Sequence, residues 1–101
     1  MPDYPTIAII GAGTMGEAII AGLLRTGLTT PDRIRCSDPR QERIAELHVR
    51  YNVKPFSDNL EAVENADIVT LSVKPQRMDR VLAGLKGRIP RDALVLSLIH
   101  I

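Results

Sequence analysis

Three glycines near the start of the chain have the spacing that binds the phosphates of a dinucleotide. Gly11, Gly13 and Gly16 form the pattern G-x-G-x-x-G, which follows the apolar run Ile7–Ile10 and precedes a helical pattern. The first glycine allows a sharp turn, the second lets a pyrophosphate approach the backbone, and the third lets helix and strand pack closely. Phosphates would then meet free N–H groups at the positive end of the helix dipole. In this context the motif predicts a dinucleotide-binding turn.

The residues between these glycines belong to the same predicted turn. They are Ala12, Thr14 and Met15. Thr14 is followed three residues later by Glu17, which is the pattern of a capping box. The Thr14 hydroxyl could therefore serve the helix, the ligand or both.

A carboxylate, Asp38, stands about 20 residues beyond the turn, where an acidic side chain accepts hydrogen bonds from the ribose hydroxyls of NAD. Arg40 and Arg43 follow closely, and an arginine here can instead hold the 2′-phosphate of NADP. Asp38 and Pro39 also fit a helix cap followed by proline at the first helical position. The residues leave NAD and NADP both open.

A second polar group follows the predicted strand 67–73. It consists of Ser72, Val73, Lys74 and Pro75. Ligands of open parallel sheets lie outside the carboxyl ends of the strands, where the strand order reverses. Lys74 is therefore well placed to approach a cofactor, although a solvated loop lysine is the plainer interpretation.

Alternating strands and helices must position these groups. We expect strands at 7–10, 33–37, 53–56, 67–73 and from 93, with helices after the glycine turn and over 39–51, 57–65 and 76–85. This order predicts an α/β fold, a doubly wound parallel sheet with right-handed crossovers. The strand that contains Pro55 should lie near an edge. The first helix should bury one apolar stripe, formed by Met15, Ala18, Ile19, Gly22 and Leu23.

Composition narrows the class of protein. The chain of 101 residues suits one domain, and its 45 % apolar content with only 3 % aromatics indicates an aliphatic core. Lys and Arg number 13 against 12 Asp and Glu, so no broad field favours nucleic acid or a membrane. A small anionic ligand held by local geometry fits this balance.

The cysteine and histidine content argues against several kinds of site. Cys36 is the only cysteine, which excludes an internal disulfide and favours a reducing compartment. The scattered histidines and cysteine form no metal-ligand set and no catalytic triad. No signal peptide is recognisable, and no apolar run is long enough to cross a bilayer. We therefore predict a cytoplasmic location.

Four segments together resemble one enzyme family. They are G-A-G-T-M-G-E-A-I-I-A-G-L at the first turn, S-D-P after the second strand, D-N before the short helix and L-S-V-K-P-Q after the fourth strand. Over about Thr6 to Val95 the chain looks like Δ1-pyrroline-5-carboxylate reductase. The resemblance implies a Rossmann-like cofactor domain and hydride transfer from NADPH or NADH to the C=N bond of a cyclic imino acid. That reaction is the last step of proline biosynthesis.

The resemblance also implies which residues touch the cofactor. Residues 11–16 would hold the pyrophosphate, Ser37, Asp38 and Asn59 would lie by the adenosine ribose, and Ser72, Val73, Lys74 and Pro75 would line the path to the nicotinamide ribose. Many relatives have Asn or Ser followed by Arg after the second strand. This chain has Asp38 and Pro39 there, which weakens a choice of NADPH over NADH.

Members of the family continue into a helical C-terminal domain that forms the dimer and supplies the imino-acid site. The resemblance therefore implies a homo-oligomeric parent and no catalytic residue in this chain, which alone should be inactive. We expect residues 1–95 to be the dinucleotide-binding domain. Residues 96–101, L-S-L-I-H-I, match what the end of a widely used sequencing transposon encodes, so we expect an adapter-derived tail.

Two other functions remain open at this point. One is the cofactor domain of another imine or hydroxyacid dehydrogenase, whose identity would lie in a further domain. The other is a stand-alone module that senses a nucleotide without chemistry. Fold-level analogy distinguishes none of these.

Overall fold

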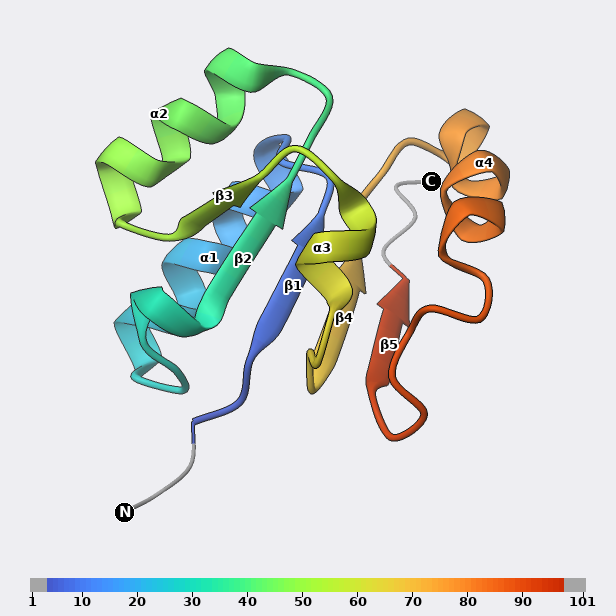
Figure 1. Ribbon diagram of the computed structural model, residues 1–101. Helices are drawn as coiled ribbons and strands as arrows, with labels where there is room; N and C mark the ends of the chain where they lie inside the picture. Colours follow the sequence, from blue (N-terminus) through green and yellow to red (C-terminus); the bar gives the residue numbers. More distant parts are fainter. Residues whose placement is uncertain (1–3, 98–101) are drawn as a thin grey trace.

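The computed structural model describes residues 4–97 and contains one parallel sheet of five strands. Its elements alternate along the chain as β1 (Ile7–Ile10), α1 (Thr14–Thr26), a 3₁₀ turn (Pro31–Arg33), β2 (Ile34–Ser37), α2 (Gln41–Tyr51), β3 (Lys54–Phe56), α3 (Asn59–Val63), β4 (Ile68–Leu71), α4 (Pro75–Leu85) and β5 (Leu94–Ser97). The predicted doubly wound α/β fold is confirmed (Figure 1).

The strands lie in the order β3-β2-β1-β4-β5. From β1 the chain continues outward through β2 and β3, and then crosses back to form β4 and β5 on the other side of β1. Ile10, the last residue of β1, lies opposite Ser37 of β2 and Leu71 of β4. The three central strands therefore end level, and the loops that follow them meet at one edge. β3 is an outer strand, as Pro55 predicted.

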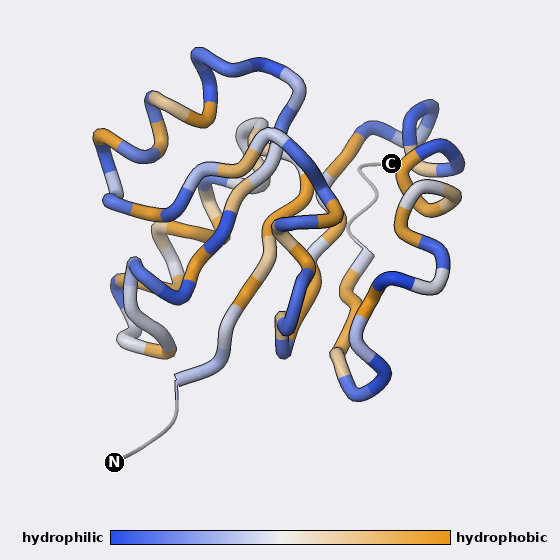
Figure 2. The backbone as a smooth tube through the Cα atoms, in the orientation of Figure 1, coloured by the Kyte–Doolittle hydropathy of each residue, from blue (hydrophilic) through white to orange (hydrophobic). Residues whose placement is uncertain are grey.

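Helices cover both faces of the sheet, α1 and α2 on one and α3 and α4 on the other (Figure 1). The side chains of β1 alternate between the two layers: Ile7 and Ile9 pack with the first pair of helices, Ala8 and Ile10 with the second. This alternation is the two-residue period of a strand buried on both faces. Figure 2 shows the resulting pattern, with hydrophobic residues along the central strands and hydrophilic and hydrophobic residues alternating along the helices.

The buried stripe of α1 is rotated from the one predicted. Gly16 and Ile20 are the buried residues, whereas Met15 is 45 % exposed. A Cβ at Gly16 would lie 2.4 Å from the Gly11 carbonyl oxygen and 3.4 Å from Ile9, so this glycine is where the helix touches the strand. The close contact at Gly16 therefore sets the rotation of α1 about its axis. The hydrophobic side chain of Met15 does not turn the helix toward the core.

The remaining expectations concern Cys36 and the end of the chain. Cys36 is completely buried in β2, and burial raises the pKa of its thiol to about 11, as befits a core residue. Leu96 and Ser97 belong to β5, while residues 98–101 of the predicted tail lie outside the described residues. Between residues 4 and 97, no helix is long and apolar enough to span a membrane, and no cluster of three metal-binding side chains occurs.

Candidate functional site

A groove of about 1130 Å³ opens at the carboxyl edge of the sheet, between the loops that follow β1, β2 and β4. This is the point where the strand order reverses, the usual ligand position of open α/β sheets. Nine predicted site residues line it: Gly11, Gly13, Thr14, Ser37, Asp38, Asn59, Ser72, Val73 and Lys74.

The glycine turn has the geometry that its spacing predicted. Gly11 has a φ of +102°, and its N–H donates to the Ser37 carbonyl at 2.9 Å. A Cβ at Gly11 would lie 2.6 Å from the Ser72 carbonyl oxygen. The chain therefore turns off β1 in a conformation and a space that only glycine accepts.

Gly13 presents backbone to the groove without obstruction. A Cβ there would meet only the Arg40 guanidinium, at 4.0 Å. Gly13 is also the N-cap of α1, and its carbonyl accepts from the Glu17 N–H at 3.0 Å. The first N–H groups of α1, beginning with Thr14, have no carbonyl partner within the helix. The capping box predicted for Thr14 and Glu17 is wrong, because no side chain caps α1.

Four predicted site residues lie outside the groove lining. They are Ala12, Met15, Gly16 and Pro75. Ala12 and Gly16 are buried under the turn, and Met15 is exposed on the outer side of α1. Pro75 is the first residue of α4, where its fixed φ suits the helix start.

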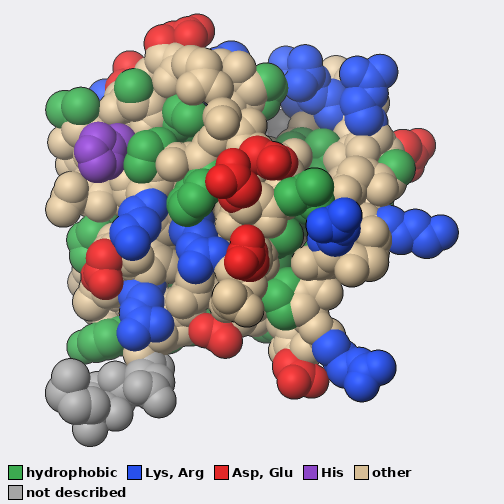
Figure 3. Space-filling model, viewed as in Figure 1, with side chains coloured by type: hydrophobic (Ala, Val, Ile, Leu, Met, Phe, Trp, Pro, Cys, Tyr) green, Lys and Arg blue, Asp and Glu red, His purple; other side chains and the backbone are tan. Residues whose placement is uncertain are grey.

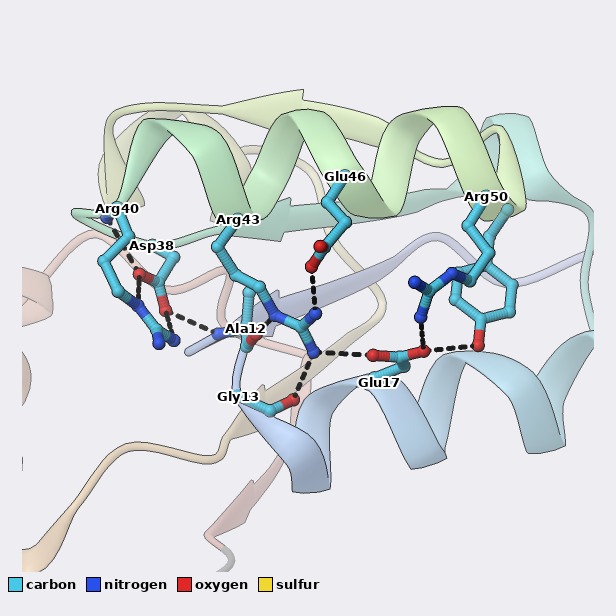
Figure 4. Close-up of polar contacts among 9 residues, drawn as sticks. Ala12, Gly13, Glu17, Asp38, Arg40, Arg43, Glu46 and Arg50 are labelled. Atoms are coloured by element: carbon cyan, nitrogen blue, oxygen red, sulfur yellow. Dashed lines mark hydrogen bonds and ion pairs between the residues drawn. The ribbon is translucent and has the colours of Figure 1, made fainter.

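Asp38 supports the glycine turn from β2. Its Oδ2 accepts the Ala12 N–H at 2.8 Å, and its side chain is 6 % exposed (Figure 4). Burial opposes ionisation, but hydrogen bonds from the Arg40 side chain and from the N–H groups of Ala12 and Arg40 outweigh it and lower the Asp38 pKa to about 2. Asp38 is therefore a buried carboxylate that remains charged.

Asp38 is not the N-cap residue of α2, although its Oδ1 accepts the Arg40 N–H at 2.9 Å. The helix α2 begins at Gln41 with Arg40 as its N-cap, so the predicted start at Pro39 is wrong. Asp38 Oδ1 accepts from the Arg40 Nε at 2.8 Å, while the Arg40 side chain is 54 % exposed. Asp38, which suggested NAD, and Arg40, which suggested NADP, thus form one ion pair at the groove.

Ser37 and Asn59 meet although 22 positions separate them in the chain. Ser37 Oγ donates to Asn59 Oδ1 at 2.5 Å. Asn59 begins α3, whose N-cap Asp58 accepts the Leu60 N–H at 2.9 Å. A hydroxyl and an amide are thereby held together beside Asp38, the kind of polar pair that suits a ribose.

Residues 6–100 match the protein family described as NADP oxidoreductase, coenzyme F420-dependent. The chain belongs to this NADP oxidoreductase family. Its family membership and the groove at the glycine turn bear out the prediction of an oxidoreductase domain for a nicotinamide dinucleotide.

Individual proteins similar to this NADP oxidoreductase domain carry a more specific name. The chain is 37 % identical to a pyrroline-5-carboxylate reductase of Methanosarcina acetivorans, covering 91 % of this chain and 34 % of the relative. It is 39 % identical to the Pseudomonas aeruginosa enzyme of that name, over 93 % of this chain and 34 % of the relative. A solved pyrroline-5-carboxylate reductase from Coxiella burnetii superposes with a TM-score of 0.89 at 31 % identity, over 96 % of this chain and 36 % of that one. The predicted resemblance is confirmed, and the chain spans about a third of the length of these relatives.

One side of the groove in this NADP oxidoreductase domain was not predicted. It is formed by the α4 residues Arg77, Arg80, Val81 and Gly84. Their spacing of three, four and seven residues places them on one helix face, a signal that was present in the sequence. Lys and Arg side chains gather over α4 in the view of Figure 3. The groove is therefore bordered by positive charge on the side away from Asp38.

Proposed function

We propose that this chain is the cofactor-binding domain of an NAD(P)H-dependent pyrroline-5-carboxylate reductase. The observation that carries the proposal is the bare backbone of Gly13, which opens into a groove of about 1130 Å³ at the end of β1. The N–H groups that begin α1 border the same groove, and anions bind at such positions. Relatives named as this reductase, at 37 and 39 % identity, support it over a nucleotide sensor or another dehydrogenase.

Each side of the groove suits one part of the dinucleotide. The glycine turn, with Thr14, would hold the pyrophosphate, and the pair Ser37 and Asn59 would face the adenosine ribose. On the other side of β1 the loop from Ser72 to Lys74 would face the nicotinamide ribose. Ala12 and Gly16 would act from beneath the turn, because both are buried.

The proposed reaction reduces the C=N bond of a cyclic imino acid. When bound, the cofactor would supply the hydride that bonds to the imine carbon, and the imine nitrogen would take a proton to give the ring of proline. This chain would orient the dinucleotide. Positioning of the imino acid and proton delivery would come from a further domain, since both are needed for rate.

Substitution of Gly13 by valine tests cofactor binding. A Cβ at this position has room, so the fold should persist, but the branched side chain would occupy the place of a phosphate. We expect the dissociation constants of NADH and NADPH to rise at least about tenfold, by isothermal titration calorimetry. Gly22→Val is the matched control: Gly22 also has open space, lies on α1 away from the groove, and should leave both constants unchanged. Equal binding by wild type and Gly13→Val would overturn the proposal.

A second measurement addresses turnover by the 101 residues alone. We expect NADPH to bind without measurable oxidation in the presence of pyrroline-5-carboxylate, followed by absorbance at the nicotinamide band. Proline formation by this chain would show that the catalytic groups lie within it, contrary to the proposal.

The choice between NADH and NADPH depends on the ion pair between Asp38 and Arg40. The buried carboxylate favours a free ribose hydroxyl, whereas the half-exposed Arg40 can offer its guanidinium to a 2′-phosphate. We propose that both cofactors are accepted.

Three further proposals, on the domain boundary, the parent enzyme and the cellular compartment, accompany this function. Residues 1–95 would form the dinucleotide-binding domain, with 96–101 as a tail, and the coding DNA beyond Val95 tests that boundary. The parent enzyme would be a cytoplasmic homo-oligomer without a nucleic-acid or membrane partner. The free thiol of Cys36 supports a reducing compartment.

A further inference from the structure

Arg43 reaches from α2 to the backbone of the glycine turn. Its Nε donates to the Ala12 carbonyl at 2.5 Å, and its Nη2 donates to the Gly13 carbonyl at 3.3 Å (Figure 4). The side chain is only 18 % exposed. One guanidinium therefore donates hydrogen bonds to two consecutive carbonyls of the turn.

Two carboxylates hold this guanidinium in place. Its Nη2 pairs with Glu17 of α1 at 2.6 Å, and its Nη1 pairs with Glu46 of α2 at 2.5 Å. A guanidinium has five N–H donors, and these contacts together use four of them: one on Nε, one on Nη1 and two on Nη2. Arg43 is therefore largely saturated by protein groups and poorly suited to hold a phosphate of its own.

Glu17 is in turn fixed by α2. It accepts from Arg50 at 2.5 Å and from the Tyr51 hydroxyl at 2.7 Å. The hydrogen bond from Tyr51 contributes most, with those from Arg43 and Arg50, to lowering the Glu17 pKa to about 2. The carboxylate is thus ionised at neutral pH, and it ties the first turn of α1 to the second helix.

The orientation of these two carbonyls fixes where the next N–H groups point. Arg43 holds the Ala12 carbonyl, and it shares the Gly13 carbonyl with the Glu17 N–H, which donates to it at 3.0 Å. In a trans peptide the C=O and the following N–H point in opposite directions. With the carbonyls of Ala12 and Gly13 directed at Arg43, the N–H groups of Gly13 and Thr14 are directed away from it. Both residues line the groove.

We propose that Arg43 is a positioning residue, which aims the N–H groups of Gly13 and Thr14 at the cofactor pyrophosphate without touching a phosphate. The inference rests on the proposed binding of a dinucleotide in this groove. It distinguishes Arg43 from Arg40, whose half-exposed side chain pairs with Asp38 at the ribose side.

The test compares Arg43→Gln and Arg43→Lys in titrations with NADH and NADPH. We expect both variants to weaken both cofactors by the same factor, about tenfold, because preorganisation is lost and lysine lacks the fork that spans two carbonyls. Arg25→Gln is the matched control: it makes the same substitution at an exposed arginine in the last turn of α1, which does not line the groove. Its affinities should stay within about twofold of wild type, since an exposed side chain away from the groove is changed. Weakening of NADPH alone, rescue by lysine, or unchanged affinities would each overturn the proposal.

A second readout needs no ligand. In the free protein, backbone ¹⁵N order parameters of Gly13 and Thr14 should fall from about 0.85 in wild type toward about 0.6 in Arg43→Gln, while circular dichroism shows the fold intact. Unchanged order parameters would refute the positioning role. If wild type binds neither cofactor, the proposed function fails, and this measurement still decides whether Arg43 orders the turn.

Discussion

Replacing Gly16 by alanine is expected to lower the free energy of unfolding by about 1–3 kcal/mol, the usual cost of overpacking. The new methyl would lie 2.4 Å from the Gly11 carbonyl oxygen, which is backbone and cannot rotate away. Either α1 must move off the sheet or the glycine turn must open. Urea denaturation followed by circular dichroism measures the loss, and cofactor affinity should fall with it because the turn is displaced.

Gly22→Ala is the control for this prediction, since it makes the same substitution in the same helix. A Cβ at Gly22 has nothing within 4 Å, so only the helix propensity changes. We expect a gain of about 0.5–1 kcal/mol. A Gly16→Ala variant as stable as Gly22→Ala would show that α1 does not approach the strand as closely as the structure has it.

Asp38→Ala should cost about 2–3 kcal/mol, because it leaves the buried Ala12 N–H without its acceptor. Arg40→Gln separates the two contributions of Asp38. It removes the half-exposed guanidinium from a buried carboxylate but keeps the acceptor for Ala12, so its cost should be smaller than that of Asp38→Ala. Equal losses in the two variants would assign the stabilisation to the ion pair instead.

The same carboxylate predicts a dependence of stability on pH. The folded-state pKa of Asp38 is about 2, below the ordinary value of 3.8, so its contribution is fully present above about pH 4 and is lost as the pH falls toward 2. A shift of this size corresponds to about 2 kcal/mol. Asp38→Asn cannot titrate and should lack this part of the acid-induced loss, which denaturation curves at pH 2.5, 4 and 6 would detect. An identical loss in wild type and Asp38→Asn would contradict the assigned pKa.

Local patterns in the chain predicted most of the fold. The glycine spacing, the short β-branched runs and the breaks between them located the strands and helices, with bounds that differ by one or two residues. Pro55 correctly indicated an outer strand, and the terminal residues of three strands correctly indicated the edge that carries the groove. These features follow from backbone geometry within a few residues, so the sequence alone carries them.

Contacts between distant segments decided the rest. The rotation of α1 depends on the approach of Gly16 to Gly11. Asp38 accepts the Arg40 N–H with one oxygen and the distant Ala12 N–H with the other, while α2 begins only at Gln41. Two hydrogen bonds of the site join residues more than 20 positions apart. One pairs Ser37 with Asn59, and the other runs from Arg43 to the Ala12 carbonyl of the glycine turn. Residue types and spacing determined that a dinucleotide turn exists. Only the packing of β2, α2 and α3 around it decided which side chains support the turn and which face the groove, because those distances depend on the whole sheet.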